Sequence, residues 1–227
     1  MAIDWHGVYP AVTTQFNDDE SINFETTGAM LDMLVREGVH GIVVNGTVGE
    51  NCSLRPEEKR AVLKSAVEIV AGRVPVLSGV AETTTTMALE YAQDAEKLGC
   101  DGLMTLPGMV YRSTEVEAIN HYQTIARGCG LPIMVYNNPV TYGVDVSIEG
   151  MKTLAEEPTI QAVKEATEDT RRISELFSAF GDRFTVFGGV DDIALESLML
   201  GATGWISGLT NVFPKESVAI YELAKQG

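Results

Sequence analysis

The sequence contains few of the residues that build disulfide frameworks and metal sites. Its three cysteines form no Cys-x-x-Cys pair, and its three histidines show neither an H-x-H nor an H-E-x-x-H spacing. Scattered cysteines in odd number argue against a disulfide framework and a zinc site, and isolated histidines leave a transition metal without obvious ligands. We therefore expect no metal, and we expect the cysteines to be small buried apolar residues. These positions are Cys52, Cys100, Cys129, His6, His40 and His121.

Basic residues are also scarce. The 227 residues include 16 lysines and arginines against 32 acidic residues, which gives a formal net charge of −16. Such a chain lacks the basic face that nucleic acids and anionic membrane surfaces attract, so neither is an expected partner. An anionic substrate would need a local site built against this overall field.

Long apolar runs are absent. Residues 1–5 lack the basic flank and apolar core of a signal peptide, and no later run approaches the length of a membrane span. These absences predict a cytoplasmic protein. The hydrophobic fraction of 45% is still large enough to build a substantial core.

A recurring junction organises what is present. The pattern glycine, two residues, glycine and an apolar residue begins at Gly38, Gly99 and Gly201, each time after a helical pattern and before a β-rich run. The first glycine suits a left-handed helix cap, and the apolar residues suit a buried strand. The junctions lie 61 and 102 residues apart. With about 30 to 35 residues in one βα unit, these gaps correspond to two and three units.

Eight such units fill the chain, which predicts a (β/α)₈ TIM barrel forming one domain over residues 1–227. The competing doubly wound sheet is disfavoured because no G-x-G-x-x-G follows the first strand. The expected strands are 7–14, 41–45, 74–80, 102–106, 132–137, one ending at Lys164, 184–188 and 205–207. The expected helices are 24–37, 53–70, 85–98, 114–127, 147–156, 170–180, 191–200 and 215–225.

Lys164 is the lysine that stands out. Six of the seven lysines fall in polar stretches typical of helices, whereas Lys164 ends a short apolar run and is expected to face a core. A partly buried lysine either pairs with a carboxylate or is kept neutral enough to attack a carbonyl, because desolvation lowers the pKa of an ammonium group. The resulting protonated Schiff base withdraws electrons, so that carbon–carbon cleavage, condensation and β-elimination become accessible.

Other polar groups are predicted to converge on the same mouth of the barrel, where the carboxyl ends of the strands meet. Tyr136 ends the strand before that of Lys164 and is a candidate proton shuttle, with packing inside the barrel as the alternative. The loop from Gly46 to Gly49 is a candidate anion cradle, since two glycines let successive amides point at one spot. The same glycines equally suit a plain strand-to-helix turn.

At these residues the chain resembles the dihydrodipicolinate synthase and N-acetylneuraminate lyase superfamily of Schiff-base barrels. The motifs that carry the resemblance are G-T-x-G-E after the second strand, Y-N-x-P after the fifth, K-E at the sixth, then G-x-D and G-x-I-S. The resemblance implies that Lys164 forms an imine with a pyruvate-like 2-keto acid, that Tyr136 shuttles protons and that Thr47 joins the relay. It implies no cofactor, and a homo-oligomer, either a dimer or a tetramer. The substrate-binding positions it suggests are Gly46, Val48, Gly189, Ile206 and Thr141.

The chain also departs from the family pattern. The pattern has a second threonine where Val48 stands, an arginine where Thr141 stands, and a tyrosine lent by a neighbouring subunit near Met109. Tyr111 is close to this last position but out of register. Family members normally continue past the barrel with further helices, and this chain is expected to lack the full C-terminal helical extension.

Three hypotheses follow for the function. The first is a Schiff-base lyase acting on pyruvate or a related 2-keto acid, by aldol cleavage or condensation, or by dehydration or deamination of a 2-keto-3-deoxy sugar acid or a hydroxy-pyrroline carboxylate. The second is dihydrodipicolinate synthase, which condenses pyruvate with aspartate semialdehyde and is disfavoured by Thr141. The third is a non-catalytic barrel that binds a 2-keto acid.

Overall fold

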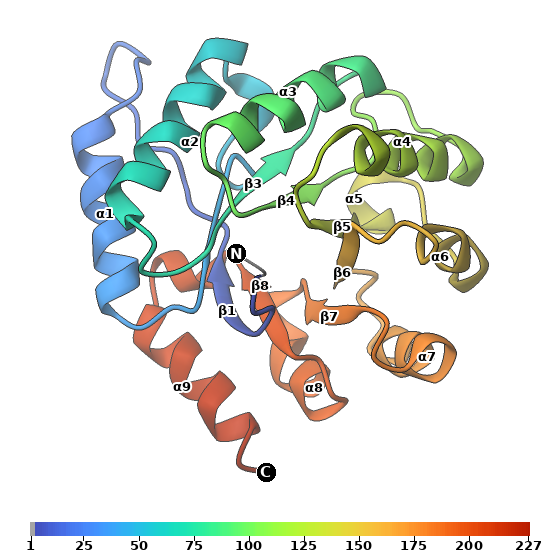
Figure 1. The fold of residues 1–227 in the computed structure, drawn as a ribbon. Helices are drawn as coiled ribbons and strands as arrows, with labels where there is room; N and C mark the ends of the chain where they lie inside the picture. The colour runs from blue at the N-terminus through green and yellow to red at the C-terminus, as the bar shows by residue number, and fades with distance from the viewer. Residues whose placement is uncertain (1–2) are drawn as a thin grey trace.

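The computed structural model describes residues 3–227 and contains one eight-stranded sheet in the order β1-β8-β7-β6-β5-β4-β3-β2. All neighbours in this order are parallel, and a bridge between Ala11 and Val43 joins the end of β1 to β2. The sheet is thus a nearly closed barrel, which confirms the predicted (β/α)₈ architecture (Figure 1). The strands are β1 (Gly7–Pro10), β2 (Ile42–Val44), β3 (Val76–Val80), β4 (Gly102–Thr105), β5 (Ile133–Asn137), β6 (Ile160–Glu165), β7 (Thr185–Gly188) and β8 (Gly204–Ser207).

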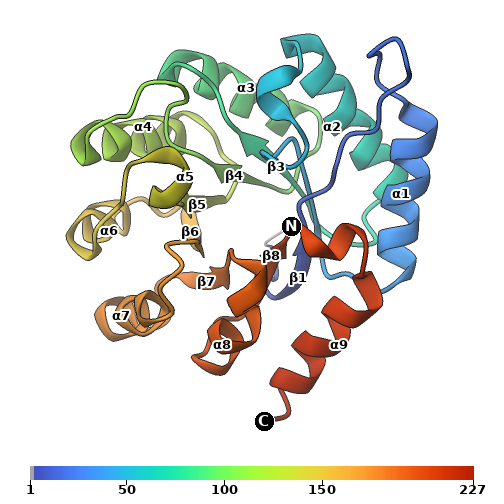
Figure 2. The same ribbon diagram turned by 180° about the vertical axis from the view of Figure 1, so that it is seen from behind.

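A ring of helices surrounds the strands (Figure 2). Each predicted helix is present with its ends shifted by a few residues, and the sequence analysis missed one short helix, α5, directly after β5. The helices are α1 (Phe24–Arg36), α2 (Pro56–Val70), α3 (Thr85–Lys97), α4 (Glu115–Gly128), α5 (Pro139–Tyr142), α6 (Ile148–Leu154), α7 (Arg171–Phe180), α8 (Ala194–Met199) and α9 (Pro214–Ala224).

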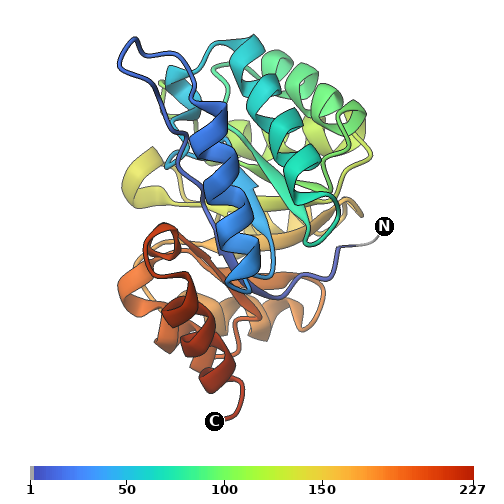
Figure 3. The ribbon, with the colours of Figure 1, turned by 90° about the vertical axis from the view of Figure 1, so that its left-hand side faces the viewer.

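The two ends of the barrel differ. Helix α5, in yellow, lies at one end of the barrel, and the N-terminal segment enters at the other (Figure 3). Because α5 follows β5 directly, it marks the end at which the strands finish and their loops converge. Within residues 3–227, no helix combines the length and apolar character needed to cross a membrane.

The junction glycines have the predicted backbone conformation. The φ angles of Gly38, Gly99 and Gly201 are +93°, +84° and +104°, a region that residues with a side chain rarely adopt. Each glycine therefore ends its helix in a left-handed turn and directs the chain back toward the barrel.

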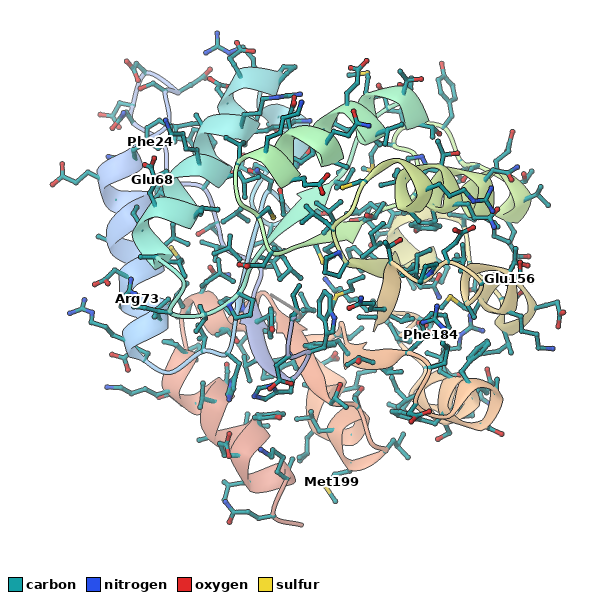
Figure 4. All side chains as sticks on the ribbon, in the orientation of Figure 1. Phe24, Glu68, Arg73, Glu156, Phe184 and Met199 are labelled. Carbon is teal, nitrogen blue, oxygen red and sulfur yellow. The ribbon has the colours of Figure 1, made fainter. Side chains whose placement is uncertain are left out.

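Two apolar layers form the core, one inside the barrel and one between strands and helices. Successive residues of a strand face opposite sides, so Met134 and Tyr136 of β5 point inward while Val135 packs against the helices. In the outer layer, Phe184 lies beside α7, whereas Glu156 and Met199 point away from the ring (Figure 4). The large inward side chains include Tyr9, Leu77, Met104, Met134, Phe187 and Ile206.

Gly79 of β3 allows the loop after β2 to cross close above the barrel. A Cβ atom at this position would lie 2.2 Å from the carbonyl oxygen of Asn45 and 2.8 Å from the amide nitrogen of Gly46. Both neighbours are backbone atoms, so neither can move without displacing the loop. The path of the 45–49 loop therefore depends on the missing side chain.

We expect Gly79→Ala to lower the free energy of unfolding by about 1–3 kcal/mol, because the added methyl group overpacks a fixed backbone. Urea denaturation followed by circular dichroism measures this change. Gly108→Ala is the matched control, since a Cβ there meets no atom within 4 Å, and we expect it to stay within about 0.5 kcal/mol of the wild type. Equal stability of the two variants would contradict the close approach.

Candidate active site

Strands β5 and β6 place Lys164 against Tyr136. Their register pairs Tyr136 with Lys164 and Met134 with Ala162, so these side chains share the inner face of the barrel. The Nζ atom of Lys164 lies 3.7 Å from the centroid of the Tyr136 ring, and the two residues are only 5% and 8% exposed. The two side-chain heads therefore meet, as the strand parity predicts.

Gly189, just after β7, borders the side chain of Lys164. A Cβ atom at Gly189 would lie 2.9 Å from Cε of Lys164 and 3.0 Å from Cβ of Ala166. The amide of Gly189 donates a hydrogen bond of 2.8 Å to the carbonyl of Glu165, which fixes this close approach. Any larger residue at this position would push the lysine aside.

The carboxylate of Glu165 anchors the end of β6 next to Lys164. It accepts hydrogen bonds from the side-chain amide of Asn137 and from the backbone amide of Thr167, and Nε of Arg172 lies 3.5 Å away. Burial raises the pKa of Glu165, although the bonds from Asn137 and the charge of Arg172 oppose this effect. Glu165 is thus committed to these partners, which hold the strand end in place.

The carboxylate-cradle prediction falls on the turn that follows β2. The carbonyls of Gly46 and Thr47 accept hydrogen bonds of 3.2 Å and 3.0 Å from later amides of the same turn. The backbone amides of Thr47 and Val48 donate to no acceptor within residues 3–227. Two neighbouring free donors at a glycine-containing turn are the arrangement that an anion-binding site needs.

Hydroxyl groups connect this turn to Tyr136. The hydroxyl groups of Thr47 and Tyr142 are 2.5 Å apart, and the rings of Tyr142 and Tyr136 are nearly perpendicular with centroids 5.5 Å apart. The side-chain amide of Asn138 donates a 3.1 Å hydrogen bond to the hydroxyl of Tyr136. The three hydroxyl-bearing side chains therefore form one cluster at the mouth of the barrel.

The two tyrosines of this cluster differ in acidity. Burial alone raises the pKa of Tyr136, but the ammonium of Lys164 and hydrogen bonds from Asn138, Lys164 and Tyr142 outweigh it and lower this pKa below its ordinary value. Burial raises the pKa of Tyr142, and the nearby phenol of Tyr136 adds to the effect. Tyr136 is thus the more readily deprotonated of the pair.

The remaining predicted binding positions lie around the mouth at different depths. Ile206 of β8 is buried inside the barrel, and Gly46 approaches Met104 of β4. Val48 is largely exposed and faces Gly208 beyond β8, whereas Thr141 lies on the exposed side of α5. The structure thus places Ile206 inside the barrel, Gly46 and Val48 on the turn after β2, and Thr141 at the exposed surface of α5.

Met109 and Tyr111 lie on the loop after β4, and Met109 packs against the apolar cluster inside the barrel. A cavity of about 560 Å³ borders both residues together with Arg112 and His121 at the start and flank of α4, and Lys164 is not among its lining residues. Tyr111 is 87% exposed. Within the described chain, neither residue supplies a hydroxyl group to Lys164.

Lys164 is not the only lysine that faces a core, contrary to the sequence prediction. Lys59 on α2 is also buried, and its Nζ atom lies 2.6 Å from Oε1 of the equally buried Glu82. The position of Lys59 in a helical stretch of the sequence did not reveal its burial, because its partner Glu82 comes from the loop after β3. Across residues 3–227, by contrast, no carboxylate oxygen lies within 4.0 Å of Nζ of Lys164.

The sulfur-containing and metal-ligating residues form no centre. Within the described residues, no three His, Cys, Asp or Glu side chains group in a way that would hold a metal ion. Cys100 and Cys129 are buried as predicted, but Cys52 is exposed because it lies on a single 3₁₀ turn, Asn51–Ser53, at the mouth.

Sequence reasoning missed Tyr142 and Asn138. Both belong to α5, in which Asn138 is the N-cap and Pro139 takes the first helical position. An asparagine before a proline is a recognisable helix start, so the signal was present. Helices this short are marginal by themselves, and only the packing of Tyr142 against Tyr136 shows its relevance.

Comparisons with known proteins agree with this geometry. The sequence model described as the dihydrodipicolinate synthetase family matches residues 4–227. A 4-hydroxy-tetrahydrodipicolinate synthase of Exiguobacterium sibiricum is 35% identical over 95% of this chain and 74% of its own length. An uncharacterized DapA-like lyase of Rhizobium meliloti is 34% identical over 100% of this chain and 75% of its own.

A solved structure adds the same relationship in three dimensions. The dihydrodipicolinate synthase from Acinetobacter baumannii, described as chloride-inhibited and complexed with pyruvate, superposes with a TM-score of 0.94 at 30% identity. The alignment covers 97% of this chain and 76% of that one. The protein therefore belongs to the dihydrodipicolinate synthetase family and is a Schiff-base lyase of that family.

Proposed function

We propose that this lyase binds pyruvate or a related 2-keto acid as an imine on Lys164. The observation that carries the proposal is the surroundings of the lysine: its amine is buried, lies 3.7 Å from the Tyr136 ring centroid, and has no carboxylate partner within residues 3–227. An amine that is not engaged in an ion pair is available as a nucleophile.

The chemistry follows from this arrangement. The amine of Lys164 adds to the keto carbon, and the carbonyl oxygen leaves as water once it has been protonated. The resulting iminium draws electrons from the neighbouring C3, so that a proton there can be removed to give an enamine. Tyr136 accepts that proton. Its pKa lies below the ordinary value because the charge of Lys164 and the hydrogen bonds to the Tyr136 hydroxyl outweigh the effect of burial. Protonating the same carbon runs the step in reverse, whereas attack of that carbon on an aldehyde forms a carbon–carbon bond as the aldehyde oxygen takes up a proton.

The carboxylate of the substrate would take the free amides of Thr47 and Val48. Both amides lie on the turn after β2 and find no acceptor within the described chain. Backbone donors hold an anion without adding a positive side chain, which suits a chain of net charge −16. Gly189 and Ile206 would form the walls beside the imine.

The substrate class we favour is a 2-keto-3-deoxy sugar acid or a hydroxy-pyrroline carboxylate, which loses water or ammonia by elimination. Elimination needs an imine, a carboxylate cradle and a proton shuttle. Aspartate semialdehyde would bring a second carboxylate, and Thr141 offers it no cation on α5. The synthase reaction is therefore the weaker candidate.

We also propose that the chain works as a homo-oligomer, a dimer or a tetramer, in the cytoplasm. Apolar side chains exposed on the loop after β4 and at the start of α4 support a contact between copies, because isolated monomers rarely leave such groups together in water. These residues are Val110, Tyr111 and Val116.

Trapping with borohydride tests the imine. We expect pyruvate and borohydride together to add about 72 Da to the wild type, the mass of pyruvate less water plus two hydrogens. Lys164→Ala should gain nothing, while the exposed-lysine control Lys97→Ala should react like the wild type. Intact-mass spectrometry reads all three. A protein that binds pyruvate without an adduct would be a non-catalytic barrel.

Removing the hydroxyl of Tyr136 tests the proton shuttle. Tyr136→Phe should still form the borohydride adduct but exchange the C3 protons of pyruvate for deuterium about two to four orders of magnitude more slowly. Because the pKa of Tyr136 is below its ordinary value, the wild-type exchange rate should already rise with pH below pH 10, as the phenol loses its proton. Proton NMR in D₂O follows both effects, and unchanged exchange would leave Tyr136 as packing only.

The identity of Thr141 tests the substrate class. We expect the wild type to turn over 2-keto-3-deoxy acids or a hydroxy-pyrroline carboxylate in preference to aspartate semialdehyde, and Thr141→Arg to raise kcat/KM for the semialdehyde about tenfold or more by pairing with its carboxylate. Thr141→Gln, which adds length without charge, is the control. A wild type that already prefers aspartate semialdehyde would refute the elimination assignment.

A further inference from the structure

Tyr142 is placed where it connects two groups that already have roles in the proposed reaction. Its hydroxyl lies 2.5 Å from Oγ1 of Thr47, and its ring stands at 83° to that of Tyr136 with centroids 5.5 Å apart. Thr47 lies at the exposed surface of the mouth, whereas Tyr136 is buried. Tyr142 therefore spans the distance from the buried phenol to solvent.

The two ends of helix α5 are fixed in a way that holds Tyr142 in place. Asn138 caps the helix by accepting a 2.9 Å bond from the amide of Thr141, and the same side chain donates to the hydroxyl of Tyr136. At the other end, Gly143 adopts φ +74° and stops the helix immediately after Tyr142. One asparagine thus fixes the helix and the catalytic phenol relative to each other.

We propose that Tyr142 completes a proton relay within a single chain, from Tyr136 through Tyr142 and Thr47 to solvent. This inference rests on the proposed function of Lys164 and Tyr136. The resemblance drawn from the sequence places a tyrosine of a neighbouring subunit in such a relay, near Met109. Here the phenol comes from the same chain, six residues after Tyr136.

The relay moves one proton and changes no oxidation state. When Tyr136 has taken a proton from C3 of the imine, it passes a proton to Tyr142, which passes its own to Thr47, which releases one to water. Each hydroxyl gives and receives one proton, so the three side chains end as they began. Tyr142 touches no reacting carbon in this scheme and acts through Tyr136, as a positioning and relay residue.

The raised pKa of Tyr142 is compatible with a group that passes protons on and stays neutral. Burial, followed by the nearby Tyr136, raises the pKa of Tyr142, while the bond to Thr47 opposes the rise. A phenol that stays protonated leaves the negative charge on Tyr136, next to the nitrogen of Lys164, which is positive as the protonated imine. Tyr136 thus acts as the base, and Tyr142 passes the proton on while remaining neutral.

The test compares Tyr142→Phe with Tyr221→Phe, a matched change on α9 far from the mouth. Exchange of the C3 protons of pyruvate in D₂O, followed by NMR, reports the relay without requiring knowledge of the full substrate. We expect Tyr142→Phe to slow exchange by about tenfold to a hundredfold with KM for pyruvate within about twofold, and Tyr221→Phe to leave it unchanged. In Tyr142→Phe, the rise of the exchange rate with pH should also shift to higher pH, because the hydrogen bond from Tyr142 that lowers the pKa of Tyr136 is lost.

Conservative changes at Thr47 separate a relay from packing. Thr47→Ser keeps the hydroxyl and should stay within about threefold of the wild type, whereas Thr47→Val keeps the shape and should fall with Tyr142→Phe. Wild-type exchange in Tyr142→Phe would overturn the inference. So would a loss seen in Tyr111→Phe but not in Tyr142→Phe, which would assign the relay to a second copy of the chain.

Borohydride trapping keeps the failure of this inference distinct from that of the proposed function. A trapped adduct on Tyr142→Phe together with slow exchange supports the relay. A wild type that forms no adduct with pyruvate removes the imine itself, and the relay falls with it. A Tyr142→Phe variant that loses both the adduct and its wild-type melting temperature would show a structural role and overturn the relay.

Discussion

The register between β5 and β6 is the constraint on which the site depends. It sets Tyr136 opposite Lys164 across two neighbouring strands, so the spacing of parallel strands, about 4.8 Å, fixes how close the amine and the phenol lie. A slip of β6 by one residue would turn Lys164 into the helix layer and away from Tyr136. The partners that hold the register are themselves polar: Glu165 is clamped by Asn137 of β5 and by Arg172 of α7, at the point where the strands end.

Several residues of the family motifs turn out to be structural supports of this arrangement. Asp191, the acidic residue of the G-x-D motif, accepts hydrogen bonds from the indole of Trp205 and the amide of Leu209 and so ties the loop after β7 to the end of β8. Gly189 of the same motif supplies the empty space into which Lys164 extends. The G-x-D motif therefore contains residues that support the position of Lys164 and of the neighbouring loops.

The barrel and its inward pair were predictable from the sequence because both depend on local patterns. Glycines such as Gly38 and Gly201 mark helix ends through their left-handed conformation, and strand parity decides which way Tyr136 points. The burial of Lys59 was not predictable, because it depends on Glu82 arriving from another βα unit. Tyr142 escaped for the same reason: its neighbours Thr47 and Tyr136 belong to different βα units, and only the closed barrel brings them together.

The four residues of α5 combine a departure from the family pattern with a contact to Tyr136. Thr141 occupies the place where the family pattern has an arginine, so α5 itself carries no cation at this position. The next residue, Tyr142, turns the other way and reaches the hydroxyl of Thr47. Because neighbouring positions of a helix point about 100° apart, Thr141 faces solvent while Tyr142 packs against Tyr136. Loss of an anion clamp at Thr141 is therefore compatible with a retained proton path at Tyr142, and this separation allows the substrate to diverge while the imine chemistry at Lys164 stays in place.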